Sequence, residues 1–250
     1  MAEYIWGRNP VLETLNSGRV IKRILLAEGL KEGGVISLIK QVAEKKRLPV
    51  EVVPRSRLDH ISKGAVHQGC VAQVEERQYA HVDDILEHAS IKNEAPFILI
   101  LDAIQDVNNL GSLLRTAEAA GVHGVVIPEH RAAEVNATVV KTSAGATEHI
   151  LIAKETNITR TIDYLKKQNV WVVGLAGEAQ TVYTQANLTG PLAIVVGNEG
   201  KGISRLVREH CDLLIKLPMY GYINSLNAAV AGSIALYEAL RQRTGNEQGR

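Results

Sequence analysis

Ile194-Val195-Val196-Gly197-Asn198-Glu199-Gly200-Lys201-Gly202 is the stretch that decides the fold, because an apolar, β-branched run leads directly into a glycine-rich loop. A short run of this kind is typical of a buried strand, and glycine permits positive φ and close approach of the backbone to a ligand. In an open α/β sheet, ligands bind in the loops at the carboxyl ends of the strands. The stretch therefore predicts one wall of a ligand pocket.

A second strand and turn follow further along the chain. Leu213 to Leu217 form an apolar run that enters the turn Pro218-Met219-Tyr220-Gly221, and the polar cluster Asn224-Ser225-Leu226-Asn227 precedes an apolar-periodic helix. We expect two adjacent strand ends and one helix start to frame a single pocket. The loop is not a P-loop, because Gly202 follows Lys201 where Ser or Thr is needed. No G-x-G-x-x-G follows an early strand, so a nicotinamide or flavin site is not expected.

The composition indicates a globular protein with an aliphatic core. Of the 250 residues, 46% are hydrophobic and only 4% are aromatic, which suits one large domain or two modest ones. No apolar run is long enough to span a membrane, and the N-terminus lacks the pattern of a signal peptide. Cys70 and Cys211 lie far apart, and the eight His residues show no ligand spacing. We therefore expect a cytoplasmic protein that binds no metal.

Charge is distributed unevenly along the chain, although the net charge is only +1. Residues 1–78 contain 13 Lys and Arg against 9 Asp and Glu, whereas residues 79–250 contain 15 against 18. A modestly basic front part can contact phosphate groups, which would suit a nucleic-acid partner. A solvated basic surface is the alternative, and charge alone leaves both open.

The order of apolar segments predicts two domains. Residues 1–76 alternate between strands and helices as a small α/β unit, residues 77–95 are polar and predict a linker, and residues 96–250 form the second domain. The second domain begins with the buried strand Phe97 to Leu101. Further strands are expected at 122–127, 170–175, 192–196 and 213–217, and helices at 109–120, 132–143, 158–168, 202–209 and 225–242. This alternation predicts a mostly parallel sheet with helices on both faces.

Three stretches in the second domain resemble the motifs of one enzyme family. Asn109-Leu110-Gly111-Ser112-Leu113-Leu114-Arg115-Thr116 resembles the first motif of the SpoU (TrmH) branch of the SPOUT methyltransferases. The glycine-rich loop resembles the second motif, and Leu217-Pro218-Met219 with Ser225-Leu226-Asn227 resembles the third. The resemblance covers nearly the whole chain. It implies a homodimer that methylates ribose 2′-hydroxyls of RNA with S-adenosylmethionine, and a C-terminal trefoil knot that forms the cofactor pocket.

The same resemblance assigns roles to individual residues. It implies that the catalytic residues are Asn109, Arg115, Glu199, Ser225 and Asn227, and that the cofactor rests on Gly197, Leu217, Met219 and Leu226. Three roles stay open for Arg115: a general base, a clamp on a phosphate group, or a plain surface residue that covers apolar neighbours. Because a guanidinium ordinarily stays protonated, the phosphate clamp is favoured over the base. Ser225 and Asn227 also suit helix capping, and both roles are compatible.

The front domain resembles the RNA-binding module of such enzymes, which is similar to a ribosomal protein fold. The carriers of this likeness are the Gly7-x-Asn9 start and the stretch Gly64-Ala65-Val66-His67-Gln68-Gly69. Candidate RNA contacts are Arg19, Lys22, Arg23 and His67, although His67 alternatively holds the turn.

This module makes the chain most similar to the bacterial 23S rRNA guanosine 2′-O-methyltransferases. Two other functions stay open: a tRNA guanosine enzyme, whose relatives generally lack such a module, and a non-catalytic rRNA-binding assembly factor.

Overall fold

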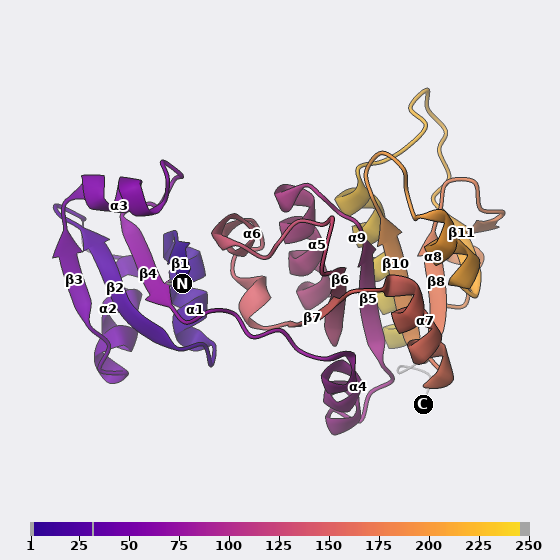
Figure 1. The fold of residues 1–250 in the computed structure, drawn as a ribbon, viewed down its shortest axis with the longest axis horizontal. Helices are drawn as coiled ribbons and strands as arrows, with labels where there is room; N and C mark the ends of the chain where they lie inside the picture. The colour runs from indigo at the N-terminus through magenta and orange to yellow at the C-terminus, as the bar shows by residue number, and fades with distance from the viewer. Residues whose placement is uncertain (1–2, 32, 246–250) are drawn as a thin grey trace. The chain divides into compact units, whose positions relative to one another are not determined.

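The structure is a computed structural model that describes residues 3–31 and 33–245, and its chain divides into two compact units (Figure 1). The first unit comprises Met1–Gln78 and Val135–His149, and the second comprises Tyr79–Glu134 and Ile150–Arg250. The outermost residues of these ranges, 1–2 and 246–250, lie outside the described part of the chain, as does residue 32. Each unit has its own sheet and core.

The first unit is built on a mixed sheet. Its strands are β1 (Glu3–Trp6), β2 (Ile21–Ala27), β3 (Val50–Val53) and β4 (Cys70–Val74), in the order β1-β4-β2-β3. Strand β4 runs antiparallel to both of its neighbours, and β2 and β3 are parallel. Apolar side chains of α1 (Arg8–Asn16) and α2 (Val35–Lys45) share one core cluster with the sheet, whereas α3 (Arg55–Ile61) contributes Leu58 to a second cluster. The sheet is therefore covered by helices on both faces.

A short insertion from the later sequence completes this unit. The helix α6 (Ala137–Thr142) and the 3-10 turn η1 (Ala146–Glu148) belong to the first unit, and Val140 is fully buried in its core. The Glu148 carboxylate forms ion pairs with both Arg19 and Arg77, and only 1% of its side chain is exposed. The sequence had placed residues 135–149 in the second domain, because an insertion in the chain order leaves no trace in local periodicity.

The predicted linker also differs from the structure. Within residues 77–95, the helix α4 (Val82–Ile91) buries Val82 and Ile85 in the core of the second unit. The side chain of Ile85 lies directly over Gly124, where an added Cβ would come within 2.5 Å of it. The segment is therefore a packed helix that begins the second unit, and its polar outer face explains why the sequence suggested a linker.

The second unit contains a parallel sheet, as the sequence predicted. Within the described residues its strands are β5 (Phe97–Asp102), β6 (Gly124–Pro128), β7 (Leu151–Glu155), β8 (Trp171–Leu175), β9 (Thr181–Val182), β10 (Leu192–Gly197) and β11 (Leu213–Lys216). Their order is β7-β6-β5-β10-β8-β11-β9, and every pairing is parallel. The sequence analysis did not predict β7 and β9.

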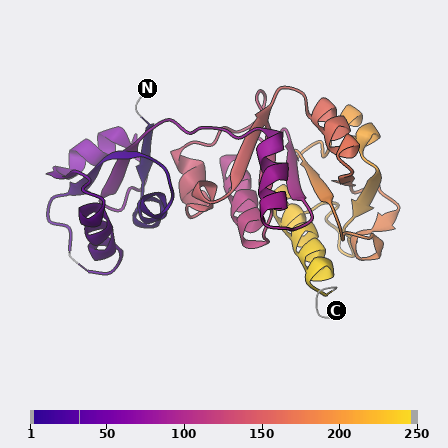
Figure 2. The ribbon, with the colours of Figure 1, turned by 90° about the horizontal axis from the view of Figure 1, so that it is seen from below.

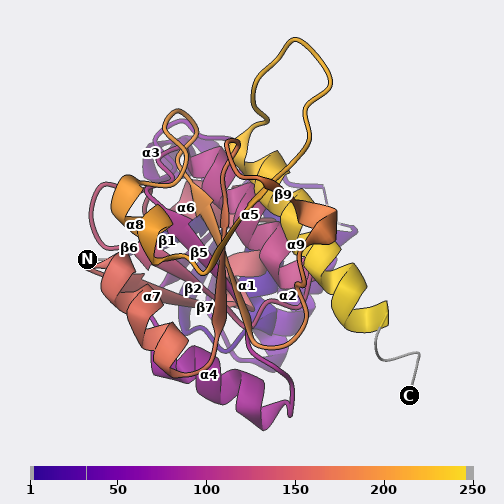
Figure 3. The same ribbon diagram turned by 90° about the vertical axis from the view of Figure 1, so that its right-hand side faces the viewer.

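Helices cover both faces of this sheet (Figure 3). On one face α4, α7 (Ile158–Lys167) and α8 (Arg205–His210) share a core cluster with alternate residues of the strands, such as Ile98 and Ile100. On the other, α5 (Val107–Ala119) and α9 (Ala228–Gly245) pack against each other and against β6 and β10. The 3-10 turn η2 (Tyr183–Gln185) contacts α9. Figure 2 shows the same ribbon from below, with α9 in yellow. Within residues 3–31 and 33–245, no helix is long and apolar enough to cross a membrane.

Parallel pairing brings three strand ends to one edge of the sheet. Strands β10 and β11 lie on either side of β8, so the carboxyl ends of all three meet. The pairing of β10 with β8 ends at Val195 and Gly174, and beyond this point the two strands separate. Their divergence opens a space at the edge where the sequence analysis expected a pocket.

Candidate active site

The loop that follows β10 is closed on itself by its own backbone. The Asn198 amide donates to the Gly202 carbonyl at 3.0 Å, and the Gly202 amide donates to the Asn198 carbonyl at 2.8 Å. A Cβ on Gly197 would lie 2.1 Å from the carbonyl carbon of Gly202, and Gly202 itself has a φ of +66°. Glycine is therefore required at 197 by close backbone approach and at 202 by the backbone angle.

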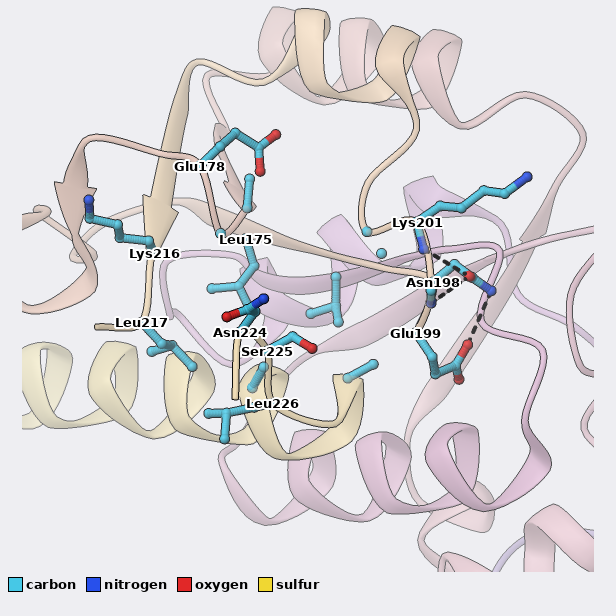
Figure 4. Close-up of a pocket in the computed structure, with 18 of the residues that line it drawn as sticks. Leu175, Glu178, Asn198, Glu199, Lys201, Lys216, Leu217, Asn224, Ser225 and Leu226 are labelled. Atoms are coloured by element: carbon cyan, nitrogen blue, oxygen red, sulfur yellow. Dashed lines mark hydrogen bonds between the residues drawn. The ribbon is translucent and has the colours of Figure 1, made fainter. Parts of the chain in front are cut away.

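A cavity of about 270 Å³ lies at the three strand ends (Figure 4). Its lining comes from the segments after β8, β10 and β11 and from the start of α9. Apolar groups of Leu175, Val196, Leu217 and Leu226 share the lining with polar groups of Glu178, Lys201, Lys216, Asn224 and Ser225. Small-molecule sites are typically clefts of about 300–1,000 Å³ with mostly apolar walls and a few polar groups, so the cavity is near the lower end of that range.

A chain of amide and carboxylate groups lies beside the cavity and joins three elements. Asn109 Nδ2 on α5 donates to Glu199 Oε1 at 2.7 Å, and Asn198 Nδ2 donates to Glu199 Oε2 at 3.1 Å. Asn227 Nδ2, immediately before α9, donates to Asn109 Oδ1 at 2.8 Å. The Glu199 carboxylate is therefore held by two amides, which fixes its orientation.

Two helix starts position this amide network. Asp106 Oδ1 accepts from the backbone amides of Asn108 and Asn109 and so caps α5. The expectation that α5 begins at Asn109 is corrected, because the helix starts at Val107 and leaves the Asn109 side chain free to bond Glu199. Asn227 Oδ1 caps α9 through the Ala229 and Val230 amides. The Asn227 side chain thus caps the helix through Oδ1 and bonds Asn109 through Nδ2, and its catalytic role stays a prediction.

The structure does not bring Arg115 to the cavity. Its side chain is exposed on α5, and among the described residues it makes no hydrogen bond or ion pair. Six residues separate it from Asn109, which at 3.6 residues per turn puts the two side chains on different faces of the helix. Any contact of Arg115 with a reacting group must therefore come from a substrate or a partner that approaches this exposed face.

The residues expected to hold a cofactor all line the cavity. Gly197, Leu217, Met219 and Leu226 are among its walls, together with Ser225 and Glu199. The sequence analysis missed the segment Leu175 to Glu178, which follows β8, and Lys216 at the end of β11. The signal for them was present, since β8 was predicted and the strand-end rule applies to it equally.

Two of the candidate RNA-contacting residues bond other residues of the first unit. Arg19 pairs with Glu3 and Glu148, and 10% of its side chain is exposed. His67 is 2% exposed; its Nδ1 accepts from the Gly69 amide at 3.0 Å, and its Nε2 bonds Asp59. This geometry matches the alternative in which His67 holds the turn.

The other two candidates are more accessible. Arg23 is partly exposed and bonds Glu51 and Gln73. Lys22 is exposed and makes no ion pair with any residue that the structure describes.

Neither cysteine has the properties of a nucleophile. Burial raises the pKa of the Cys211 thiol to about 12, with a further contribution from the nearby Asp212 carboxylate, and burial also raises the pKa of Cys70 to about 12. The described part of the chain contains no cluster of three or more His, Cys, Asp or Glu side chains that could hold a metal ion. Polar groups around the cavity are thus amides, hydroxyls, lysines and carboxylates.

Comparisons with known proteins identify the family of both parts of the chain. The model of the SpoU rRNA Methylase family matches residues 96–237, and a model described as RNA 2′-O ribose methyltransferase substrate binding matches residues 4–80. The chain is 46% identical over 241 residues to "Putative TrmH family tRNA/rRNA methyltransferase YacO" of Bacillus subtilis (strain 168), an alignment that covers 96% of each protein.

Solved structures share the fold. The SpoU methyltransferase AviRb from Streptomyces viridochromogenes, in complex with AdoMet, superimposes with a TM-score of 0.81 at 24% identity and covers 97% of this chain and 90% of its own. The A. aeolicus TrmH/SpoU tRNA modifying enzyme gives a TM-score of 0.57 at 28% identity, covering 66% of this chain and 85% of its own. Motifs, fold and relatives agree, and the chain belongs to the SpoU/TrmH family of RNA 2′-O-ribose methyltransferases.

Proposed function

We propose that this protein transfers the methyl group of S-adenosylmethionine to the 2′-hydroxyl of a guanosine in 23S rRNA. The observation that carries the proposal is the cavity at the ends of β8, β10 and β11, which lies beside the carboxylate–amide network of Asn109, Glu199 and Asn227. A ribose hydroxyl is a weak nucleophile, so the site must orient it and allow its proton to leave. The cavity can hold the methyl donor, and the network offers polar groups that can orient the hydroxyl.

The cavity suits the cofactor in its chemistry. Leu175, Leu217 and Leu226 offer apolar walls for a flat base, and the backbone at Gly197 passes so close to Gly202 that no side chain intrudes there. Glu178 and Ser225 supply polar groups for hydroxyls and an amino-acid end. The AdoMet complex of AviRb, which has the same fold, supports this assignment. When bound, S-adenosylmethionine supplies an electrophilic methyl group.

In the proposed reaction, the 2′-oxygen forms a bond to the methyl carbon as the carbon–sulfur bond breaks, and the hydroxyl proton passes to a base or to water. We propose that Glu199 and its amide partners orient the ribose hydroxyl at the reacting centre. Arg115 is assigned to a phosphate of the RNA, because a guanidinium stays protonated and forms bidentate bonds to phosphate. Its exposed position on α5 leaves it accessible for that contact.

Ribosomal RNA is favoured over tRNA by the presence of the front unit. Residues 4–80 match a substrate-binding model for RNA 2′-O-ribose methyltransferases, and the tRNA modifying enzyme from A. aeolicus covers only 66% of this chain. In the front unit Lys22 is exposed and Arg23 partly exposed, and both are candidates for phosphate contacts. The complete network of Asn109, Glu199 and Asn227 argues against a non-catalytic assembly factor.

We also propose that the protein is a homodimer with a trefoil knot in its C-terminal part, as the family resemblance implies. Val230 is 48% exposed and Tyr237 51% exposed on α9, and such apolar groups would be covered by a second copy. The convergence of three separate loops on one cavity is compatible with the knot. Sedimentation of the purified protein measures the oligomeric state directly.

The experiment that tests the proposed substrate is incubation with labelled S-adenosylmethionine and separate pools of unmodified 23S rRNA, 16S rRNA and tRNA. Incorporation into 23S rRNA alone supports the proposal, and incorporation into tRNA alone replaces it with the tRNA alternative. A protein that binds 23S rRNA and labels none of the three pools would be an assembly factor. Glu199→Gln serves as the control variant, because it keeps the shape of the side chain and removes its charge.

A further inference from the structure

Two tyrosine rings are fully exposed on the loop that also supplies part of the cavity lining. They belong to residues 218–226, here named the aromatic loop, which connects β11 to α9 and extends away from the body of the second unit (Figure 3). Tyr220 is 96% exposed, Tyr222 is 104% exposed, and the neighbouring Ile223 is 72% exposed. No other large apolar side chain of the described residues is as exposed as the two tyrosines.

Aromatic residues are scarce in this chain, which contains only seven Tyr, two Trp and one Phe in all. A tyrosine ring buries about 150–250 Å² when it is covered, so two open rings leave a large apolar area in water. Among the described residues, the backbone and side chains of residues 218–226 make no hydrogen bond to the body. The loop is therefore shaped to meet something other than its own unit.

The position of the loop ties the rings to the reaction. Met219, Asn224, Ser225 and Leu226 of the same loop line the cavity, so the two tyrosines stand within a few residues of the cavity wall on both sides. A nucleotide whose 2′-hydroxyl enters this site must bring its neighbours to the rim. A loop that supplies part of the cavity lining can therefore offer its other side chains to the nucleotides next to the target.

The loop itself is uncharged, which suits stacking on neutral bases. Residues 218–226 contain no charged side chain, and the cavity beside them is lined by two lysines, Lys201 and Lys216, and by two carboxylates, Glu178 and Glu199. Aromatic rings combined with nearby cations are the pattern with which proteins hold unpaired RNA, because the ring stacks on a base while the cation meets the phosphate.

We propose that Tyr220 and Tyr222 are positioning residues that stack on unpaired bases flanking the target nucleotide of the RNA. This inference rests on the proposed function in so far as the substrate is RNA, and it does not depend on which RNA that is. Because stacking accepts every base, the aromatic loop holds the strand while the front unit and the site select the target.

The test compares ring-removing with ring-keeping variants of both positions. The probes are a short unpaired RNA carrying 2-aminopurine, whose fluorescence falls on stacking, and a 23S rRNA fragment in single-turnover methylation. Tyr220→Ala and Tyr222→Ala should each weaken binding of the oligonucleotide about 5- to 100-fold and reduce the quenching, and the double variant should abolish it. The corresponding Phe variants should stay within about twofold of the wild type, and the Leu variants should behave as Ala.

Ile223→Ala is the matched control, because it removes an exposed apolar side chain from the same loop without removing a ring. It should leave RNA binding unchanged. Calorimetric affinity for S-adenosylmethionine and the sedimentation coefficient should be unchanged in all variants.

Three outcomes would overturn the inference. Full activity of the Leu variants would mean that an apolar side chain suffices and a ring is not needed. A loss of cofactor affinity in the Ala variants would mean that the loop covers the cofactor. Dissociation of the Ala variants into smaller species would mean that the loop forms a contact between copies of the chain. Failure of the proposed function would give a different result from failure of this inference. The wild-type protein would then methylate no 23S rRNA, while the unpaired oligonucleotide would still be quenched.

Discussion

Gly197→Ala tests whether the closed loop after β10 builds the cofactor pocket. The new Cβ would lie 2.1 Å from the Gly202 carbonyl carbon, 2.1 Å from the Ile203 nitrogen and 2.3 Å from the Gly202 oxygen. All three are backbone atoms, so the clash cannot be relieved by rotation of a side chain. The loop must open by roughly 1 Å before these contacts become ordinary ones.

Opening the loop costs the two backbone hydrogen bonds between Asn198 and Gly202, of 3.0 and 2.8 Å. At about 1 kcal/mol for each bond, the native loop is disfavoured by about 2 kcal/mol. If cofactor binding needs the native loop, its affinity falls by the same amount, which is about 30-fold. The cofactor can restore the native loop only if part of its binding free energy offsets those ~2 kcal/mol, taken as about 1 kcal/mol for each hydrogen bond.

Isothermal calorimetry with S-adenosylmethionine measures this loss, and urea unfolding shows that the variant remains folded. Gly18→Ala is the matched control, because no heavy atom lies within 4 Å of its added Cβ and Gly18 is not part of the cavity lining, so the affinity should change by less than about 0.5 kcal/mol. Wild-type affinity in a folded Gly197→Ala protein would refute the reasoning, and so would equal losses in both variants.

Three further predictions concern single side chains. Arg115→Ala should lower the rate of single-turnover methylation about 10²–10³-fold while the cofactor affinity stays unchanged. Arg115→Lys should recover little of that rate if the planar guanidinium is needed. A near wild-type rate of Arg115→Ala at every pH would make Arg115 a plain surface residue. Glu148→Ala removes the carboxylate partner of the buried Arg77 and leaves Arg19 paired with Glu3 alone, so it should destabilise the first unit by about 3–5 kcal/mol in urea unfolding. A change below about 1 kcal/mol would contradict the burial argument. Hydrogen bonds from Arg241 and then from Gln242 lower the pKa of Glu238 below its usual value of 4.5. The carboxylate therefore stabilises the fold fully above its unfolded-state pKa, and this stabilisation is lost as the pH falls through its folded-state pKa. Glu238→Gln should flatten this acidic part of the curve of unfolding free energy against pH, and an unchanged curve would exclude a contribution from Glu238.

The sequence predicted the parallel sheet of the second unit because its strands are unbroken apolar runs. Phe97 to Leu101 and Leu192 to Val196 are each bounded by polar or turn residues, and both are central strands. Strand β9, of only two residues, pairs solely with β11 at the sheet edge and carries no periodic signal. Residues 135–149 belong to the first unit through tertiary packing of Val140 and Glu148, which no local pattern reveals.

The candidate site was predictable in part for a similar reason. Glycine-rich and polar stretches mark the ends of β10 and β11, so the cavity walls near Gly197 and Leu217 followed from strand ends alone. Which side chains bond one another did not follow, because the pairing of Asn109 with Glu199 and Asn227 joins residues 90 and 118 positions apart. The family resemblance named those residues, and the structure supplies the physical link between them.

The central claim is that the chain methylates a ribose 2′-oxygen of guanosine in 23S rRNA. Nucleoside analysis of the methylated RNA tests it most directly, because a 2′-O-methyl group blocks alkaline cleavage of the adjoining phosphodiester bond, whereas a methyl group on a base does not. We expect label from S-adenosylmethionine in alkali-resistant dinucleotides of 23S rRNA that yield 2′-O-methylguanosine on full digestion. Label recovered solely as a base-methylated nucleoside, or solely in tRNA, would contradict it.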